Sequence, residues 1–303
     1  MLYGFDVGGT KIAFSVYDQA LNCLFEDQTP TPHDYASFIA TISDMVDQAD
    51  KKFSIKGQVG LGFPGAINPE DMTLNCANVP AIKGRPLIQD LSVALDREIK
   101  IENDANCFLL SECFGGSADG CATVLGVTLG TGVGGAIFVN GNILTGKNSF
   151  AGEIGHYPLP ATLLKKHPEL PNLICGCGRQ MCLELYVSGT GLGNLYKHYA
   201  KQPLKGPAIL EKYRAGDKTA IKVIDVYFDI IAAGVGTAML VLDADAIVFG
   251  GGLSKFEILV EEFTKRLPEH LLNNVQLPII VTAKFGGEGG VRGAALLNHQ
   301  NFK

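Results

Sequence analysis

The sequence has no excess of basic charge, no apolar run of membrane-spanning length and no low-complexity segment. Its 303 residues carry 25 Lys and Arg side chains against 31 Asp and Glu, which gives a formal net charge of −6. This acidic balance argues against a nucleic-acid or membrane-surface role. A transmembrane helix needs about 20 consecutive, mostly apolar residues, and we read no run of that length.

A secretory signal is also missing. Met1 leads directly into "LYGFDVGG", without a basic stretch or an apolar signal core. We therefore predict a cytoplasmic protein, in which the eight cysteines stay reduced and a thiol cluster indicates metal rather than disulfides. The scattered cysteines are predicted to be small buried apolar residues. They are Cys23, Cys76, Cys107, Cys113 and Cys121.

The chain is long enough for two domains, and 47% of it is hydrophobic. A strand, a glycine turn and a second strand are predicted over residues 2–17, and the same pattern returns over residues 123–139. Helical spacing of apolar residues predicts helices over 37–53 and 218–243. The repeated pattern indicates two similar α/β lobes, with a boundary near residues 115–117.

Three glycine turns follow apolar strands, at residues 8–11, 130–132 and 250–252. Backbone N–H groups in such turns can point at phosphate oxygens, because no Cβ blocks the approach. A plain hairpin is the alternative for each turn taken alone. In the first turn, Asp6 is a candidate for holding Mg²⁺ through water, and Lys11 is a candidate for facing phosphate. The "GTGLG" at residues 189–193 lacks a good preceding strand, so we interpret it as the start of a helix.

"IENDANC" places Asn103 and Asp104 where a strand gives way to a helix. Helix capping is one interpretation, since both residue types cap well. The other is that the carboxylate accepts a proton from a substrate hydroxyl. Further polar candidates for binding sugar hydroxyls are Asn78, Glu153, His156 and Glu184, although each is also an ordinary loop residue type.

"CGCGRQMC" brings Cys175, Cys177 and Cys182 into one short loop. Three thiolates plus one more ligand would complete a tetrahedral zinc site. The spacing departs from that of common zinc fingers, and unbound thiols remain the alternative.

The motifs "GFDVGGTK", "GFPG", "ENDAN", "LGTGVGG", "GEIGH", "CGCGRQMCLE" and "FGGGLS" follow the order found in the ROK sugar kinases. The resemblance runs from about residue 2 to about residue 297. Within that family, the residues in and around these motifs are most similar to those of the kinases that act on N-acetyl-D-glucosamine.

The resemblance implies an α/β actin-like ATPase fold, with two RNase H-like lobes around a central cleft. We place a small N-terminal lobe at residues 1–116, completed by a C-terminal helix at 290–303. A larger lobe at 117–289 carries the thiol loop. The expected protein binds a sugar and ATP, does not bind nucleic acid or membranes, and forms a homodimer by family analogy.

The resemblance also implies ATP- and Mg²⁺-dependent phosphorylation of a sugar 6-hydroxyl, with Asp104 as catalytic base. The implied sugar contacts are Asn78, Asn103, Asp104, Glu153, His156 and Glu184. The implied nucleotide contacts are Gly4, Phe5, Asp6, Val7, Gly8, Gly9, Thr10, Lys11, Gly130, Thr131, Gly132, Val133, Gly134, Gly250, Gly251 and Gly252. The implied ligands of a structural zinc ion are His156, Cys175, Cys177 and Cys182.

Other functions stay open. The nearest alternative is a glucokinase or another hexose kinase of the same family. A sugar-responsive repressor would need a DNA-binding module ahead of the first glycine turn, where only a few residues precede Asp6. A non-catalytic binding module would not require a carboxylate at Asp104.

Overall fold

The computed structural model describes residues 1–76 and 78–299. The chain forms two compact units. Unit 1 comprises Met1–Gly120, Ile137–Ala151 and Lys284–Lys303, and unit 2 comprises Cys121–Ala136 and Gly152–Ala283. The chain therefore passes between the units four times, and neither unit is one continuous stretch of sequence.

Unit 1 is built on a five-stranded sheet with the order β3-β2-β1-β4-β7. The first three strands form an antiparallel meander, whereas β4 and β7 run parallel to β1. The central strand β1 is apolar on both faces because helices cover both of them. The strands are β1 (Leu2–Val7), β2 (Lys11–Tyr17), β3 (Cys23–Pro30), β4 (Gln58–Phe63) and β7 (Ile99–Asn103).

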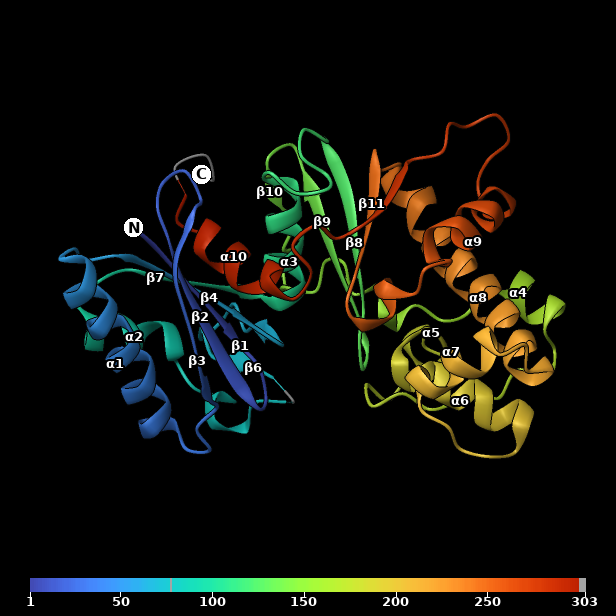
Figure 1. The fold of residues 1–303 in the computed structure, drawn as a ribbon, viewed down its shortest axis with the longest axis horizontal. Helices are drawn as coiled ribbons and strands as arrows, with labels where there is room; N and C mark the ends of the chain where they lie inside the picture. Colours follow the sequence, from blue (N-terminus) through green and yellow to red (C-terminus); the bar gives the residue numbers. More distant parts are fainter. Residues whose placement is uncertain (77, 300–303) are drawn as a thin grey trace. The chain divides into compact units, whose positions relative to one another are not determined.

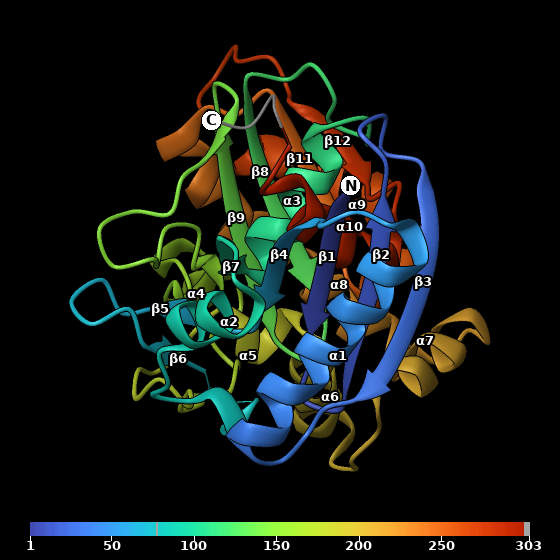
Figure 2. The ribbon, with the colours of Figure 1, turned by 90° about the vertical axis from the view of Figure 1, so that its left-hand side faces the viewer.

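Helices α1 (Tyr35–Phe53) and α2 (Leu87–Leu95) cover one face of this sheet, as Figure 2 shows. The Asp34 side chain caps α1 by accepting the Ser37 N–H at 2.9 Å. Apolar residues at helical spacing in α1 then enter the main core of the unit. They are Phe38, Ile42, Met45, Val46 and Ala49.

The other face of the sheet is covered by α3 (Asp104–Cys113) and α10 (Gly289–Leu296). A Cβ on Gly4 of β1 would lie 2.0 Å from the Val291 carbonyl oxygen, and one on Gly60 of β4 would lie 2.0 Å from that of Ala294. Glycines on two neighbouring strands therefore allow α10 to lie against the backbone of the sheet. Three smaller elements complete this part of unit 1. They are the hairpin β5 (Ala66–Ile67) and β6 (Leu74–Asn75), and the 3-10 turns η1 (Pro80–Ile82) and η5 (Gly286–Glu288).

The C-terminal part of unit 1 is fastened to α3 by a buried carboxylate. Glu112 accepts the backbone N–H groups of Lys284 and Phe285 at 3.0 and 2.9 Å, and that of Ser117 at 3.0 Å. Arg292 of α10 adds a hydrogen bond to the Ser111 carbonyl at 2.8 Å. Segments far apart in the sequence thus meet at the end of one helix.

The second sheet has the order β10-β9-β8-β11-β12. Here β8, β11 and β12 are parallel, and β9 pairs antiparallel with β10. Strand β9 crosses the boundary between the units after Ala136, so β10 belongs to unit 1. The strands are β8 (Thr123–Leu129), β9 (Val133–Val139), β10 (Asn142–Ile143), β11 (Ala246–Gly250) and β12 (Ile279–Thr282).

Unit 2 contains most of the remaining helices, drawn from green to orange in Figure 1. By length and composition alone, α8 could cross a membrane, which the sequence reading had not anticipated. However, 83% of its most apolar window is buried, as expected of a core helix. The helical elements are η2 (Ile154–His156), α4 (Ala161–Lys166), α5 (Glu184–Val187), α6 (Gly189–Ala200), α7 (Gly206–Arg214), α8 (Lys218–Leu242), η3 (Gly252–Lys255), α9 (Leu259–Arg266) and η4 (Leu267–His270).

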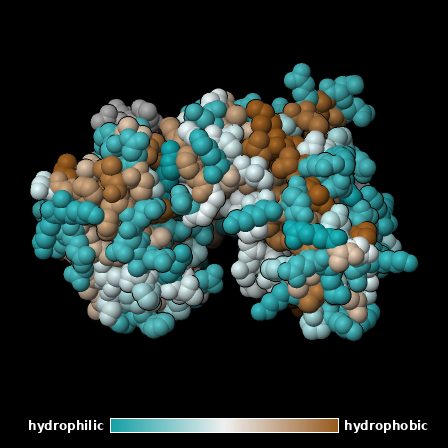
Figure 3. Space-filling view, in the orientation of Figure 1, coloured by the Kyte–Doolittle hydropathy of each residue, from teal (hydrophilic) through white to brown (hydrophobic). Residues whose placement is uncertain are grey.

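Apolar side chains gather on the surface around β11 and β12 in Figure 3. Ile279 of the edge strand β12 is 54% exposed, and the preceding loop exposes Leu272 and Leu277. Two cysteines also differ from the prediction of burial. Cys23 is exposed because it begins the solvent-facing edge strand β3, and Cys121 is only partly buried.

Candidate functional site

The Asn103–Asp104 pair lies where β7 ends and α3 begins. The Asn103 side-chain oxygen accepts the backbone N–H groups of Ala105 and Asn106 at 2.8 and 3.3 Å, so it is the N-cap. Its amide donates to the Gly65 carbonyl at 2.9 Å, which ties the cap to the "GFPG" turn. Asp104 is the first residue of α3 and is exposed. The capping interpretation therefore holds for Asn103. The Asp104 carboxylate also accepts the Ala105 N–H, at 2.9 Å, and lies at the surface.

The first glycine turn joins β1 to β2. Its predicted nucleotide contacts fall on β1 (Gly4, Phe5, Asp6 and Val7), in the turn (Gly8, Gly9 and Thr10) and at the start of β2 (Lys11). The Gly8 N–H donates to the Lys11 carbonyl at 2.9 Å, which closes the turn. A Cβ on Gly9 would lie 2.5 Å from the Asn78 carbonyl oxygen, so the turn lies directly against the exposed residue Asn78.

Asp6 is a partly buried carboxylate next to this turn. Burial raises the pKa of Asp6 above its usual value, and the Lys11 ammonium partly offsets the shift. A Cβ on Gly290 of α10 would lie 2.8 Å from the Asp6 carboxylate, so the helix leaves space that the carboxylate occupies. Burial also raises the pKa of the Cys107 thiol, and Asp6 and Asp104 both add to that shift. The two carboxylates therefore lie near one buried thiol of unit 1.

The second glycine turn, residues 130–132, joins β8 to β9 in unit 2. The Gly130 N–H donates to the Gly132 carbonyl at 3.0 Å, and the Gly130 carbonyl accepts from Gly189 at 2.7 Å. The Thr128 hydroxyl accepts the Gly134 N–H at 3.1 Å and braces the base of the turn. The predicted contacts Val133 and Gly134 lie on β9.

The third glycine turn follows β11. Gly250 ends the strand, and Gly251 has a φ of 82°, a left-handed conformation that favours glycine. A Cβ on Gly251 would lie 2.6 Å from the Leu129 backbone. Gly252 begins the short 3-10 turn η3, which ends at Lys255.

A cavity of about 830 Å³ lies in unit 2, between the second and third glycine turns on one side and α6 and α7 on the other. That volume is typical of a site for a ligand of nucleotide size. Of the predicted nucleotide contacts, Gly130, Thr131 and Gly252 line it. Sequence reasoning missed the rest of the wall, because α6 and α7 contribute to it only through tertiary packing. Missed lining residues include Thr190, Asn194, Lys197, Leu204, Lys205, Pro207 and Arg214.

The predicted zinc ligands come together in unit 2. The ligand atoms of His156, Cys175, Cys177 and Cys182 all lie within 4.8 Å of one another. The Cys177 and Cys182 sulfurs are 3.7 Å apart, and the Cys175 sulfur is 3.7 Å from His156 Nδ1. Two sulfurs bound to one zinc ion at tetrahedral angles lie about 3.8 Å apart. Both the donor set and its spacing therefore fit zinc.

Backbone hydrogen bonds fix the thiol loop. The Cys175 N–H donates to the Arg179 carbonyl at 2.8 Å, and the Gly178 N–H returns to the Cys175 carbonyl at 2.9 Å. Burial raises the pKa of Cys175 to about 12, whereas a backbone hydrogen bond from Arg179 lowers the pKa of the exposed Cys177. Zinc binding would have to displace the Cys175 proton, because the thiolate is the metal ligand.

The predicted sugar contacts of unit 2 surround His156. Its Nδ1 faces the Cys175 sulfur, and its Nε2 lies 3.9 Å from the Glu153 carboxylate. Glu184 accepts from the Cys175 thiol at 3.1 Å and lies 3.9 Å from His156 Nδ1. Burial raises the pKa of Glu153, and Glu184 adds to that shift while His156 opposes it.

The same carboxylate links this group to the second glycine turn. A Cβ on Gly132 would lie 2.9 Å from the Glu184 carboxylate, so a glycine at this position leaves room for that side chain. The side chains of Glu153, His156 and Glu184 are 40%, 36% and 25% exposed, so a ligand can reach all three. Two acceptors and one imidazole within a few ångströms suit the recognition of sugar hydroxyls.

The chain resembles known proteins over nearly its whole length. The chain is 44% identical over 300 residues to the N-acetyl-D-glucosamine kinase of Escherichia coli O127:H6 (strain E2348/69 / EPEC), covering 98% of this chain and 99% of that protein. The ROK hexokinase from Thermus thermophilus is 28% identical with a TM-score of 0.87, covering 97% of this chain and 96% of that one.

A ROK family glucokinase from Streptomyces griseus, solved with glucose and AMPPNP, is 27% identical with a TM-score of 0.77 and covers 98% of both chains. These structures confirm the predicted α/β fold of the actin-like ATPase class. The model of the ROK family matches residues 2–301. Because these likenesses extend over almost its whole length, the chain belongs to the ROK family.

Proposed function

We propose that this protein is a kinase that transfers the terminal phosphoryl group of ATP to the 6-hydroxyl of N-acetyl-D-glucosamine. The product is N-acetyl-D-glucosamine 6-phosphate, an intermediate in the recycling of amino sugars. The observation that carries the proposal is 44% identity over 98% of the chain to an N-acetyl-D-glucosamine kinase. Sugar kinase chemistry is also what the arrangement of the site suits best.

In unit 1, Asp104 acts as the general base that accepts the proton of the 6-hydroxyl. Its exposed position at the first residue of α3 supports this role, because a substrate can reach the carboxylate. Asn103 fixes the local backbone through its cap, so its remaining amide hydrogen is held in position to donate to the sugar. The exposed residue Asn78, beside the first glycine turn, contributes a further hydrogen bond to the sugar.

In unit 2, Glu153, His156 and Glu184 bind the remaining sugar hydroxyls. His156 Nδ1, Cys175, Cys177 and Cys182 would hold a zinc ion with four protein ligands, a closed set typical of structural sites. The zinc ion, when bound, supplies structural order and no hydrolytic chemistry. With Nδ1 bound to zinc, His156 would direct its Nε2 toward Glu153 and the substrate. The zinc ion would thereby fix the orientation of the imidazole that faces Glu153.

ATP is bound by the glycine turns and by the cavity of unit 2. Backbone N–H groups of residues 8–11 and 130–132 face the phosphates. The turn at Gly250, Gly251 and Gly252 binds the adenosine side, where Gly252 lines the cavity. Mg²⁺, when bound with ATP, neutralises phosphate charge in the transition state. Asp6 would hold this ion through water, and the raised pKa of its carboxyl would make that interaction sensitive to acid.

The phosphorylation of glucose or another hexose is the second candidate function, because solved relatives include a hexokinase and a glucokinase. We further propose that the protein works in the cytoplasm, where its thiols stay reduced, and that it forms a homodimer. Sedimentation analysis tests the dimer directly, since a single species at the mass of the 32.2 kDa chain would contradict it.

The decisive experiment measures ADP release with N-acetylglucosamine, N-acetylmannosamine, glucose and fructose in parallel. We expect the highest kcat/KM with N-acetylglucosamine. A higher value with glucose would replace the proposed substrate but keep the kinase. No sugar-dependent ADP release with any of the four would overturn the assignment.

A further inference from the structure

Helix α8 contains two glycines in its middle, Gly234 and Gly236, although glycine is a poor helix former. A Cβ on Gly234 would lie 2.6 Å from both Cδ atoms of Leu183. A Cβ on Gly236 would lie 2.6 Å from the Cβ of His270 in η4. The two glycines thus accommodate different neighbours on different faces of the same helix.

Leu183 stands between two residues of the candidate site. It follows the zinc ligand Cys182 and precedes the sugar contact Glu184. Its side chain is only 1% exposed, and its N–H donates to the Tyr157 carbonyl at 2.8 Å. Cys182 also forms an isolated β-bridge with Pro158. Because the surroundings are packed, a displaced Leu183 has little room to adopt another rotamer without moving its backbone.

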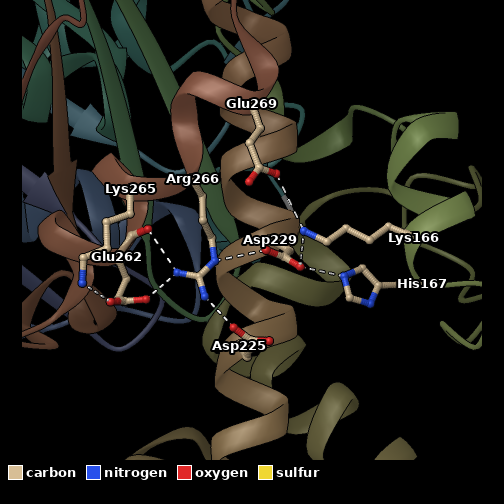
Figure 4. A network of polar contacts seen from close by, with 8 residues as sticks. All are labelled: Lys166, His167, Asp225, Asp229, Glu262, Lys265, Arg266 and Glu269. Carbon is tan, nitrogen blue, oxygen red and sulfur yellow. Dashed lines mark hydrogen bonds and ion pairs between the residues drawn. The ribbon is translucent and has the colours of Figure 1, made fainter.

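The helix on the other side of this contact is firmly held, as Figure 4 shows. Asp229, on α8, accepts from His167 Nε2 at 2.8 Å, Lys166 Nζ at 3.0 Å and Arg266 Nε at 3.1 Å. Burial alone would raise the pKa of Asp229, but the hydrogen bonds from Lys166 and His167 outweigh it and hold the pKa low. Arg266 also pairs with Asp225 one turn earlier.

A second tie joins α8 to the segment that follows Leu183. The hydroxyl of the buried residue Tyr227 donates to the Val187 carbonyl at 3.1 Å, which fixes the end of α5 against the helix. The charged cluster and this hydrogen bond both precede Gly234 along α8. A methyl group added at position 234 would therefore displace Leu183 rather than the helix.

From these contacts we propose that Gly234 and Leu183 form a positioning contact that sets the zinc ligand Cys182 and the sugar-binding Glu184 together. Because Gly234 has no side chain, the Leu183 side chain can pack directly against α8. Since Leu183 is joined by peptide bonds to Cys182 and Glu184, its packing against α8 fixes the positions of both residues. The statement about Glu184 rests on the proposed function, whereas the statement about Cys182 needs only the thiol cluster.

The test compares Gly234→Ala with Gly236→Ala in the full-length, zinc-loaded protein. Both variants add one methyl group to the same helix at the same distance from a neighbour, so they match in chemistry. Zinc release to a colorimetric chelator is followed in time, and the KM values for N-acetylglucosamine and ATP are measured separately.

We expect Gly234→Ala to release zinc about tenfold faster, the scale seen when support of a metal ligand is lost. Its KM for the sugar should rise about tenfold, because Glu184 is misplaced, while the KM for ATP stays within about twofold. Gly236→Ala should lower the melting temperature yet keep zinc release and sugar KM within about twofold of the unaltered protein.

Equal zinc release from the two glycine variants would overturn the proposal. If Gly234→Ala does not fold, Leu183→Ala removes the same contact from the other side, and Leu192→Ala, at an equally buried leucine of α6, is its control. Faster zinc release from Leu183→Ala alone supports the contact, and equal release overturns it. If no sugar is phosphorylated, the proposed function fails, but the comparison of zinc release still decides the positioning of Cys182.

Discussion

The two sheets share one strand order, yet they carry different chemistry. In each sheet an antiparallel hairpin is followed by two parallel strands, and a glycine turn closes the hairpin. Two residues before the turn, β1 has Asp6 and β8 has Thr128. The carboxylate of Asp6 lies beside α10, whereas the Thr128 hydroxyl is used to brace its own turn. One scaffold therefore supplies a charged group beside the glycine turn in unit 1 and a neutral support for the glycine turn in unit 2.

The elements that follow the sheets widen this difference. In unit 1, the strand β7 leads into α3 and places Asp104 at its start. Unit 2 instead adds the thiol loop and the 830 Å³ cavity. Strand order thus fixes where the turns lie, while single side chains at the strand ends give the two units different chemical groups.

The largest expected effect tests the acid–base role of unit 1. Asp104→Asn should lower kcat about 10²- to 10⁴-fold, because a general base is lost. The affinity for the sugar, measured by calorimetry, should change little. Asp34→Asn is the control, since it makes the same change at the N-cap of α1, where asparagine caps equally well. An Asp104→Asn variant that keeps most of its rate would show that the base lies elsewhere.

The second prediction addresses the carboxylate that distinguishes β1 from β8. Asp6→Asn should reduce kcat/KM for ATP about 100-fold and raise the Mg²⁺ concentration required, because a group that neutralises phosphate charge is removed. Burial raises the pKa of Asp6, so its carboxylate takes up a proton at a higher pH than an ordinary aspartate does. As the pH is lowered, activity that depends on the ionised form of Asp6 should therefore be lost earlier. A variant with an unchanged Mg²⁺ titration would argue against this role.

The third prediction concerns the zinc loop. Because burial raises the pKa values of Cys175 and Cys182, protons compete with zinc for these sulfurs. Affinity should fall as the pH falls, by about tenfold per pH unit for each thiol that must lose a proton. Zinc release to a chelator at successive pH values measures this dependence. Cys23→Ser, which removes an exposed thiol outside the cluster, should leave the profile unchanged.

The smallest expected effect lies in the neutral turn of unit 2. Thr128→Val removes the acceptor of the Gly134 N–H and should cost about 1 kcal/mol of stability. The KM for ATP, measured from initial rates at increasing ATP concentrations, should rise only slightly. If Thr128→Val impaired catalysis with ATP as strongly as Asp6→Asn, the two turns would not differ in the way proposed.

Much of the scaffold could be predicted from the sequence because its signals are local. Alternating and continuous apolar runs predicted the paired strands, and the helix start at residues 189–193 is confirmed by the Ser188 cap of α6. The four candidate zinc ligands could be identified as well, since three lie in one loop and the resemblance supplied His156.

What the sequence could not predict depends on contacts between distant segments. The wall that α6 and α7 give to the cavity, and the contact of Gly234 with Leu183, arise only from tertiary packing. Cys23 was wrongly predicted to be buried, because a thiol at a sheet edge has the same sequence signal as one in a core. The stretch at residues 137–151 lies in unit 1 although its neighbours on both sides lie in unit 2.

The attachment of α10 to β1, and of Lys284 and Phe285 to Glu112, has a consequence for biosynthesis. A ribosome makes the first five-stranded sheet early, but the helix that covers one of its faces emerges only after all of unit 2. Until then, that face and the Glu112 carboxylate lack their final partners. The nascent chain must therefore wait in an incomplete state, and truncation shortly before residue 284 should yield a product that cannot mature.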